Sequence, residues 1–101
     1  MMIETADSHF EWDIAKEQYN IAKHGISFSE ATKAFLDEKR IIAEDIEHSL
    51  VETRYYCFGK VEENVLTVRF TMRQHKIRII GAGFWRKGRS IYEQARQSYL
   101  Y

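Results

Sequence analysis

The chain has 101 residues, of which 45% are hydrophobic, and its 15 basic residues balance its 15 acidic ones. This length fits one domain with one core, so we treat residues 1–101 as a single domain. No apolar run approaches the roughly 18 residues of a membrane span and the N-terminus lacks the apolar stretch of a signal peptide, so we expect a cytoplasmic protein without membrane contacts.

The first quarter of the chain predicts a flexible start, a short strand and a helix. Residues 1–8 show no periodicity and are expected to be flexible, whereas residues 9–12 alternate as in a strand. Asp13 can cap a helix over residues 14–23, and Gly25 can end it. The expected apolar face of this helix consists of Ala15, Tyr19 and Ala22.

A second helix precedes a run of strands. Ser27 and Glu30 form a capping box for a helix to about residue 36. Its buried face is expected to consist of Phe28, Ala31 and Phe35. The period then changes from 3.6 to 2, which predicts strands over residues 41–45, 54–60, 65–72 and 76–82.

The C-terminal part completes an α+β domain. Ser90 and Glu93 form a further capping box, which predicts a helix to about residue 98. The element order is then β-α-α-β-β-β-β-α, with two N-terminal helices and one C-terminal helix. Short connections between successive strands predict a small antiparallel sheet, with the helices on one of its faces.

The last three strands predict a basic sheet face. A turn through Arg73 and Gln74 pairs apolar with apolar positions and places Arg69 opposite Arg78. Two like charges there repel each other, so either an anion lies between them, or they reach solvent or pair with Glu side chains. A four-residue loop at residues 61–64 adds the preceding strand. The exposed face then carries Arg54, Tyr56, Arg69, Thr71, Lys76 and Arg78, which suits phosphate binding and stacking on unpaired bases.

Charge is sorted along the chain. Residues 1–65 carry 14 acidic and 7 basic residues, whereas residues 66–101 carry one acidic and eight basic residues. A basic region on a compact domain favours a phosphate-bearing partner. The alternative is a solvated surface that pairs with the acidic part of the chain.

Few other residues suggest chemistry. Cys57 lies in an apolar run and is expected to be a buried thiol, and no metal-ligand spacing or glycine-rich phosphate loop occurs. We therefore expect no metal and no cofactor. Metal-free RNA cleavage needs a base for the 2′-hydroxyl, cations for the phosphate and an acid for the leaving oxygen. His24, at a helix end, and His48, in a polar loop, suit the acid and base roles, although capping and plain surface exposure are the alternatives.

Several motifs resemble the BrnT family of bacterial toxins. The opening signature of that family is matched by residues 10–13 (FEWD), Lys16 and residues 23–31 (KHGISFSEA). Its middle motif resembles Asp45, His48 and residues 52–55 (ETRY). Its late strands and final helix resemble residues 71–73, 77–80 and 92–93. The resemblance runs from about residue 9 to about residue 97.

This resemblance implies a RelE-like fold, RNA cleavage that blocks translation, and an antitoxin similar to BrnA. The antitoxin would neutralise the toxin, and operator DNA would be bound only through the antitoxin. The expected assembly is a toxin homodimer or a heterotetramer of toxin and antitoxin. With the residue chemistry above, it leads us to predict catalytic roles for Lys23, His24, His48, Arg54, Arg69 and Arg78. The predicted RNA-binding residues are Tyr56, Arg73, Lys76, Trp85, Arg86, Lys87 and Arg89.

One stretch departs from the family pattern. Typical members continue the last strand as ISARRA with further arginines, whereas residues 80–89 read IGAGFWRKGR here, with Gly83 and Phe84 in place of two arginines. If the two missing arginines carry catalysis, the protein is weak, altered in specificity or inactive. The alternative is that Arg86, Lys87 and Arg89 occupy the same space and that Trp85 adds a stacking surface. The alternative function is a non-catalytic binding module that partners a DNA-binding antitoxin in operon repression.

Overall fold

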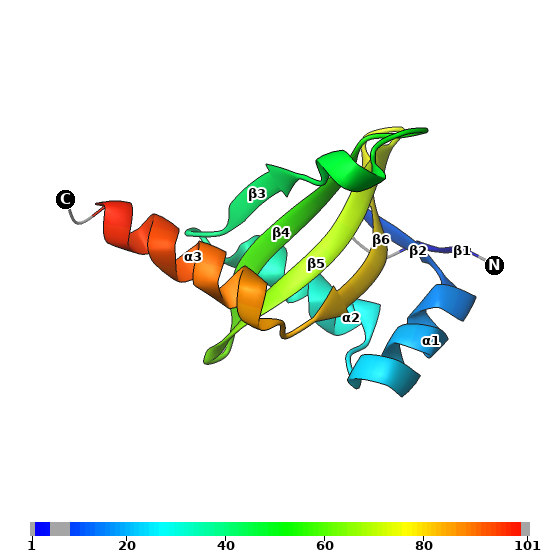
Figure 1. Cartoon of the computed structure of the whole chain (residues 1–101). Helices are drawn as coiled ribbons and strands as arrows, with labels where there is room; N and C mark the ends of the chain where they lie inside the picture. The colour runs from blue at the N-terminus through cyan, green and yellow to red at the C-terminus, as the bar shows by residue number, and fades with distance from the viewer. Residues whose placement is uncertain (1, 5–8, 100–101) are drawn as a thin grey trace.

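The computed structural model describes residues 2–4 and 9–99, which form one mixed sheet with helices on both sides (Figure 1). The described strands are ordered β1-β2-β6-β5-β4-β3 across a six-stranded sheet. In chain order the elements are β1 (Met2–Glu4), β2 (Phe10–Asp13), α1 (Ile14–His24), α2 (Phe28–Ala31), the 3₁₀ helix η1 (Thr32–Leu36), β3 (Ile41–Glu44), the 3₁₀ helix η2 (Ile46–His48), β4 (Arg54–Val61), β5 (Asn64–Arg73), β6 (Lys76–Gly83) and α3 (Arg86–Tyr99). No described helix is long and apolar enough to cross a membrane.

The α+β class is confirmed, but the sheet is not purely antiparallel. Strands β3 to β6 pair antiparallel with their sequence neighbours, as predicted, whereas β2 lies parallel to β6. The long connection through α1 to β5 permits that parallel pairing, and no local periodicity reveals it. Residues 2–4 were expected to be flexible, yet β1 pairs antiparallel with β2; the expectation for residues 5–8 lies outside the described residues.

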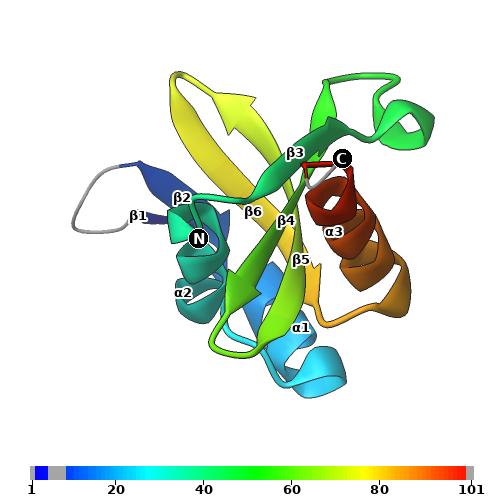
Figure 2. The same ribbon diagram turned by 90° about the vertical axis from the view of Figure 1, so that its left-hand side faces the viewer.

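Helices cover both faces of the sheet, which corrects the expectation of one covered face. Figure 2 shows α2 and α3 on opposite sides of the strands. The backbone of η1 packs so closely on Gly59 that a Cβ there would overlap Ala34. On the other side, α3 packs through Gly88 against Phe58 and Thr67. Since Phe58 and Gly59 are neighbours in β4, they face opposite sides of the sheet, and a core lies on each side.

The N-terminal helices begin and end as their caps predict. Asp13 accepts a hydrogen bond from Ala15 N, Gly25 takes the left-handed conformation at φ 71°, and Ser27 accepts from Glu30 N. The second helical segment continues from α2 into η1, and Phe28, Ala31 and Phe35 face the core as expected.

The predicted apolar face of α1 is wrong. Tyr19 is 65% exposed, Ala15 and Ala22 are exposed, and Asn20 is the buried residue of this helix. Helix α1 lies beside the end of β6 that extends past its partner β2, so its buried contact residue is one that can satisfy the unpaired backbone of that strand. This placement leaves one side of α1 free to line a surface pocket.

The hairpin registers place the basic residues differently from the prediction. The β5–β6 turn uses Gln74 and His75, both with positive φ, and pairs Thr71 with Arg78. The predicted pairing of Arg69 with Arg78 is therefore wrong. A bulge between Arg69 and Phe70 shifts the register further, so that Arg69 lies opposite Gly81. Because these shifts preserve the side that each residue faces, the basic residues stay on one face.

Two further sequence predictions are tested by the fold. Helix α3 begins at Arg86 rather than at Ser90, and Glu93 lies within it, 3.9 Å from the Arg89 guanidinium. Cys57 is fully buried as expected, and burial raises the pKa of its thiol to about 12.

Candidate functional site

A basic pocket of about 410 Å³ opens between α1, β5 and β6. Its polar and aromatic lining residues are Lys16, Tyr19, Asn20, Lys23, His24, Arg69 and Trp85. No Asp or Glu is among the described residues that line it. The pocket therefore gathers three permanent cations, a histidine and two aromatic rings, which is a composition suited to a phosphate flanked by bases.

Asn20 fixes the position of α1 beside this pocket. Its amide nitrogen donates to Ala82 O at 2.9 Å and to Ile26 O at 3.0 Å, and its amide oxygen accepts from Ala82 N at 3.1 Å. Strand β2 pairs with β6 only as far as Ile79, so Asn20 replaces a strand partner at Ala82. Glu17 on the same helix accepts from Trp12 Nε1 and Phe28 N, and so ties α1 to β2 and to the start of α2.

Arg69 lies on the pocket floor, with its guanidinium over Gly81. A Cβ at position 81 would lie 4.0 Å from Arg69 Nη1 and 3.7 Å from Asn20 Oδ1, so a larger residue would begin to fill the pocket. No carboxylate of the described residues pairs with Arg69. An unpaired, partly buried guanidinium in a cationic pocket favours binding of an anion.

Trp85 forms the end wall of the pocket. Its ring packs directly on the backbone of Gly83, where a Cβ would lie 2.5 Å from Trp85 Cζ2. The His24 ring meets the indole edge-on, with a centroid distance of 5.2 Å and an interplanar angle of 87°. The departure at Gly83 thus has a structural consequence, since glycine lets Trp85 fold back against His24.

A second histidine, on the other side of Arg69 from the basic pocket, is hydrogen-bonded to a buried carboxylate. His48 Nδ1 lies 2.8 Å from Asp45 Oδ2, and the Asp45 side chain is only 7% exposed. Burial raises the pKa of Asp45, but hydrogen bonds from His48 and Tyr56 outweigh this effect and hold it below the ordinary value. Burial and the nearby Asp45 charge raise the pKa of the Tyr56 hydroxyl. Asp45 thus stays ionised and orients the His48 ring.

Tyr56 connects this pair to the pocket. It is the direct cross-strand neighbour of Arg69, and both face the same side of the sheet as predicted. Since β5 lies between β6 and β4, Arg69 stands between the His24 pocket on one side and the Tyr56–Asp45–His48 group on the other.

Other predicted site residues lie outside this arrangement. Arg78 Nε donates to Glu11 Oε2 at 2.8 Å in a partly buried ion pair. Pairing with a Glu side chain was one of the alternatives that the sequence left open for this arginine. Arg54 and Arg73 both contact Glu52, at 3.8 and 3.3 Å. Lys76 is the cross-strand neighbour of Arg73 in the backbone register of the β5–β6 hairpin. Arg86 and Arg89 line a second, smaller pocket beside Trp85, whereas Lys87 lines neither pocket.

Sequence reasoning missed Lys16 and Tyr19 as pocket residues. The periodicity of α1 predicts a buried face for Tyr19, and Lys16 stands out in the sequence only as part of a family motif. Lys16, Tyr19 and Lys23 follow a helical spacing of three and four, which places them on one face of α1. That stripe of two lysines around a tyrosine was the signal that could have identified them.

Comparison with protein families finds a match over residues 12–88 to the model of the ribonuclease toxin BrnT of type II toxin–antitoxin systems. Comparison with curated proteins finds no significant match. The matched range includes all of α1 and strands β3 to β6, and hence every side chain that lines the basic pocket. The chain belongs to the BrnT family of ribonuclease toxins, which act in type II toxin–antitoxin systems.

Proposed function

We propose that this protein is an endoribonuclease toxin that cleaves RNA at the basic pocket without a metal ion. The observation that carries the proposal is the meeting of Arg69, Lys23 and His24 in one pocket without a lining carboxylate. Family membership supports the ribonuclease class. Among the described residues, no cluster of three His, Cys, Asp or Glu side chains could hold a metal ion, so we derive the reaction from the side chains themselves.

Cleavage in this proposal is an internal transfer at phosphorus. A base takes the proton of the ribose 2′-hydroxyl, and the 2′-oxygen forms a bond to the adjacent phosphorus. The bond from phosphorus to the 5′-oxygen breaks, and an acid gives that oxygen a proton. The products are a 2′,3′-cyclic phosphate and a 5′-hydroxyl end. Arg69 and Lys23 would stabilise the extra negative charge that the phosphate carries in the transition state.

His24 and His48 are the proposed acid and base. His24 shares the pocket with Arg69, and Asp45 holds His48 on the other side of that arginine. Histidine can both accept and donate a proton near neutral pH. Tyr19 and Trp85 would stack on the bases that flank the cleaved bond.

The proposal extends to the cellular role. Membership of a type II toxin–antitoxin family implies an antitoxin partner. We propose that a BrnA-like antitoxin neutralises this toxin and carries the contact with operator DNA, and that RNA cleavage in the cytoplasm blocks translation.

Expression without the antitoxin tests this proposal. The chain and its Arg69→Ala variant would be expressed from a tightly controlled promoter, with Arg40→Ala as a matched control, because Arg40 is exposed and lies outside the pocket. We expect growth arrest and RNA fragments with wild type and Arg40→Ala, and normal growth with equally abundant, folded Arg69→Ala. Toxicity of Arg69→Ala equal to wild type would refute the site. Normal growth with soluble wild type would favour the non-catalytic binding module.

A further inference from the structure

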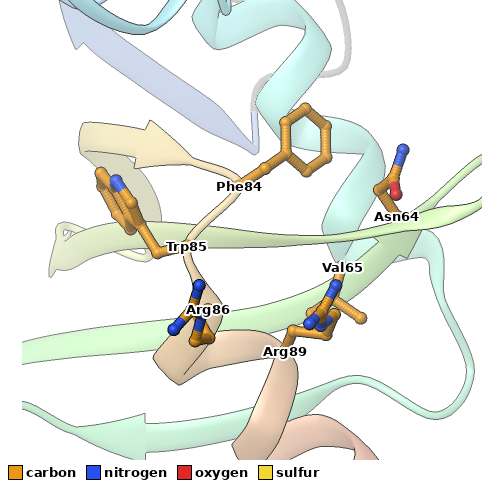
Figure 3. Close-up of a pocket in the computed structure, with 6 residues that line it drawn as sticks. All are labelled: Asn64, Val65, Phe84, Trp85, Arg86 and Arg89. Atoms are coloured by element: carbon orange, nitrogen blue, oxygen red, sulfur yellow. The ribbon is translucent and has the colours of Figure 1, made fainter.

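A second pocket adjoins the basic pocket and shares Trp85 with it. This hollow of about 240 Å³ is lined by Asn64, Val65, Phe84, Trp85, Arg86 and Arg89 (Figure 3). It lies where the β4–β5 turn approaches the connection from β6 to α3. Pockets for small molecules usually measure about 300–1,000 Å³, so this one suits a single flat group.

Phe84 offers this pocket an aromatic face. Its side chain is 46% exposed and belongs to neither core cluster of the described residues. Figure 3 shows its ring projecting from the β6–α3 connection on the opposite side from Trp85. The other five phenylalanines lie in or against a core, whereas the exposed Phe84 ring beside this hollow is available to stack on a base.

The first turn of α3 adds positive charge. Arg86 has no carboxylate partner among the described side chains. Arg89 lies 3.9 Å from Glu93, but both side chains are more than 60% exposed, so the pair is weak and can yield to a phosphate. No acidic side chain of the described part of the chain lines this hollow. Aromatic and guanidinium groups thus adjoin each other, as they do in sites for single-stranded nucleic acid.

We propose that the second pocket binds the nucleotide that follows, along the strand, the two nucleotides flanking the cleaved bond, with its base on Phe84 and its phosphate held by Arg86 and Arg89. This inference rests on the proposed ribonuclease function and adds a requirement to it: the substrate must be single-stranded there, because stacking on Phe84 needs an unpaired base. Trp85 lines both pockets, so a strand that passes it places successive nucleotides in each. Gly83 permits this position of Trp85, since a Cβ would overlap the ring.

Oligonucleotide binding tests the inference separately from catalysis. Fluorescence anisotropy would measure the affinity of non-cleavable 2′-O-methyl RNA strands of one to six nucleotides. The proteins compared would be wild type, Phe84→Ala, Phe84→Tyr and Leu36→Ala. Phe84→Tyr keeps the ring, and Leu36→Ala is a matched control because Leu36 is 77% exposed on η1 and lines neither pocket.

The expected result depends on strand length. Affinity should rise once a strand reaches the second pocket, and Phe84→Ala should lower the affinity of those longer strands by roughly 5- to 150-fold, the usual effect of losing one stacked base. Phe84→Ala should bind the shortest strands as wild type does, and Leu36→Ala should bind every strand as wild type does. Phe84→Tyr, which keeps the ring, should retain most of the affinity for the longer strands. Arg86→Gln should lower the salt dependence of binding by about 0.7 in its logarithmic slope.

Three results would overturn the inference. Phe84→Ala with wild-type affinity for every length, or with equal weakening at every length, would show that the pocket holds no nucleotide of its own; cleavage that still depends on Arg69 would then leave the proposed function intact. Failure of the wild type to bind any strand would overturn both.

Discussion

Replacing Asn20 by alanine should loosen α1 and thereby dismantle the basic pocket. The side chain is 5% exposed and makes three hydrogen bonds, two of them with Ala82 and one with Ile26. Alanine would leave these backbone groups of Ala82 and Ile26 without partners, and both residues are almost fully buried. Each unsatisfied buried group costs about 1–3 kcal/mol, and because neighbouring losses are not additive we expect a total of about 3–5 kcal/mol.

Urea denaturation would measure this loss as a change in the free energy of unfolding. A domain of this size has a stability of about 5–15 kcal/mol, so the variant should remain mostly folded at low temperature. The matched control is Gln18→Ala, because Gln18 is exposed on the same helix and should change stability by less than about 0.5 kcal/mol. Hydrogen exchange should show faster exchange of the Ala82 amide and of α1 than of β4 and β5.

A loss below about 1 kcal/mol for Asn20→Ala would refute the reasoning. It would mean that water reaches Ala82 or that another group replaces the amide, so that α1 is not held by Asn20. The same outcome would weaken the case that α1 positions Lys23 and His24 rigidly beside Arg69.

Three further predictions follow from single contacts. Because burial raises the pKa of Cys57 to about 12, its thiol should react with a thiol reagent at pH 8 only as fast as the protein unfolds, and rapid labelling of the folded protein would contradict its burial. Burial raises the pKa of Asp37, but hydrogen bonds from Tyr92 and from backbone amides outweigh it and hold the pKa below 3.8. Asp37 therefore contributes stability above about pH 3.8 that is lost as the pH falls through its folded value. Tyr92→Phe should accordingly cost about 1 kcal/mol at pH 7 and clearly less at pH 3, and an equal cost at both would contradict the link. Gly83→Ala should displace the indole, so Trp85 emission, measured in a Trp12→Phe background, should shift to longer wavelength; an unchanged spectrum would contradict the packing of Trp85 on Gly83.

Local signals in the sequence predicted the local structure well. The period of two over β3 to β6 and the caps at Asp13, Gly25 and Ser27 act between near neighbours, so each is visible in a short window. The placement of Tyr56 on the same face as Arg69 was also predictable, because alternation fixes the face even where the register is uncertain.

Contacts between distant segments were not predictable in the same way. Arg78 and its partner Glu11 lie 67 residues apart and meet through the parallel pairing of β2 with β6, which leaves no local pattern. The orientation of α1 was misjudged because Asn20 looks like a surface residue, whereas its amide satisfies both backbone groups of Ala82. The spacing of Lys16, Tyr19 and Lys23 could place them on one face of α1, but that this face lines the basic pocket depends on the orientation of the helix, which only the structure shows.

Cleavage of RNA by the purified protein in the presence of a metal chelator tests the central claim most directly. Wild type, Arg69→Ala and Arg40→Ala would be incubated with a single-stranded RNA, and with a copy that carries 2′-deoxyribose at the cleaved nucleotide. The account predicts cleavage by wild type and Arg40→Ala without metal, 2′,3′-cyclic phosphate ends, no cleavage of the 2′-deoxy copy, and at least a 100-fold slower reaction of Arg69→Ala, as expected from about 3 kcal/mol of lost charge stabilisation. Cleavage that requires a metal ion, or that proceeds equally well with Arg69→Ala, would contradict it.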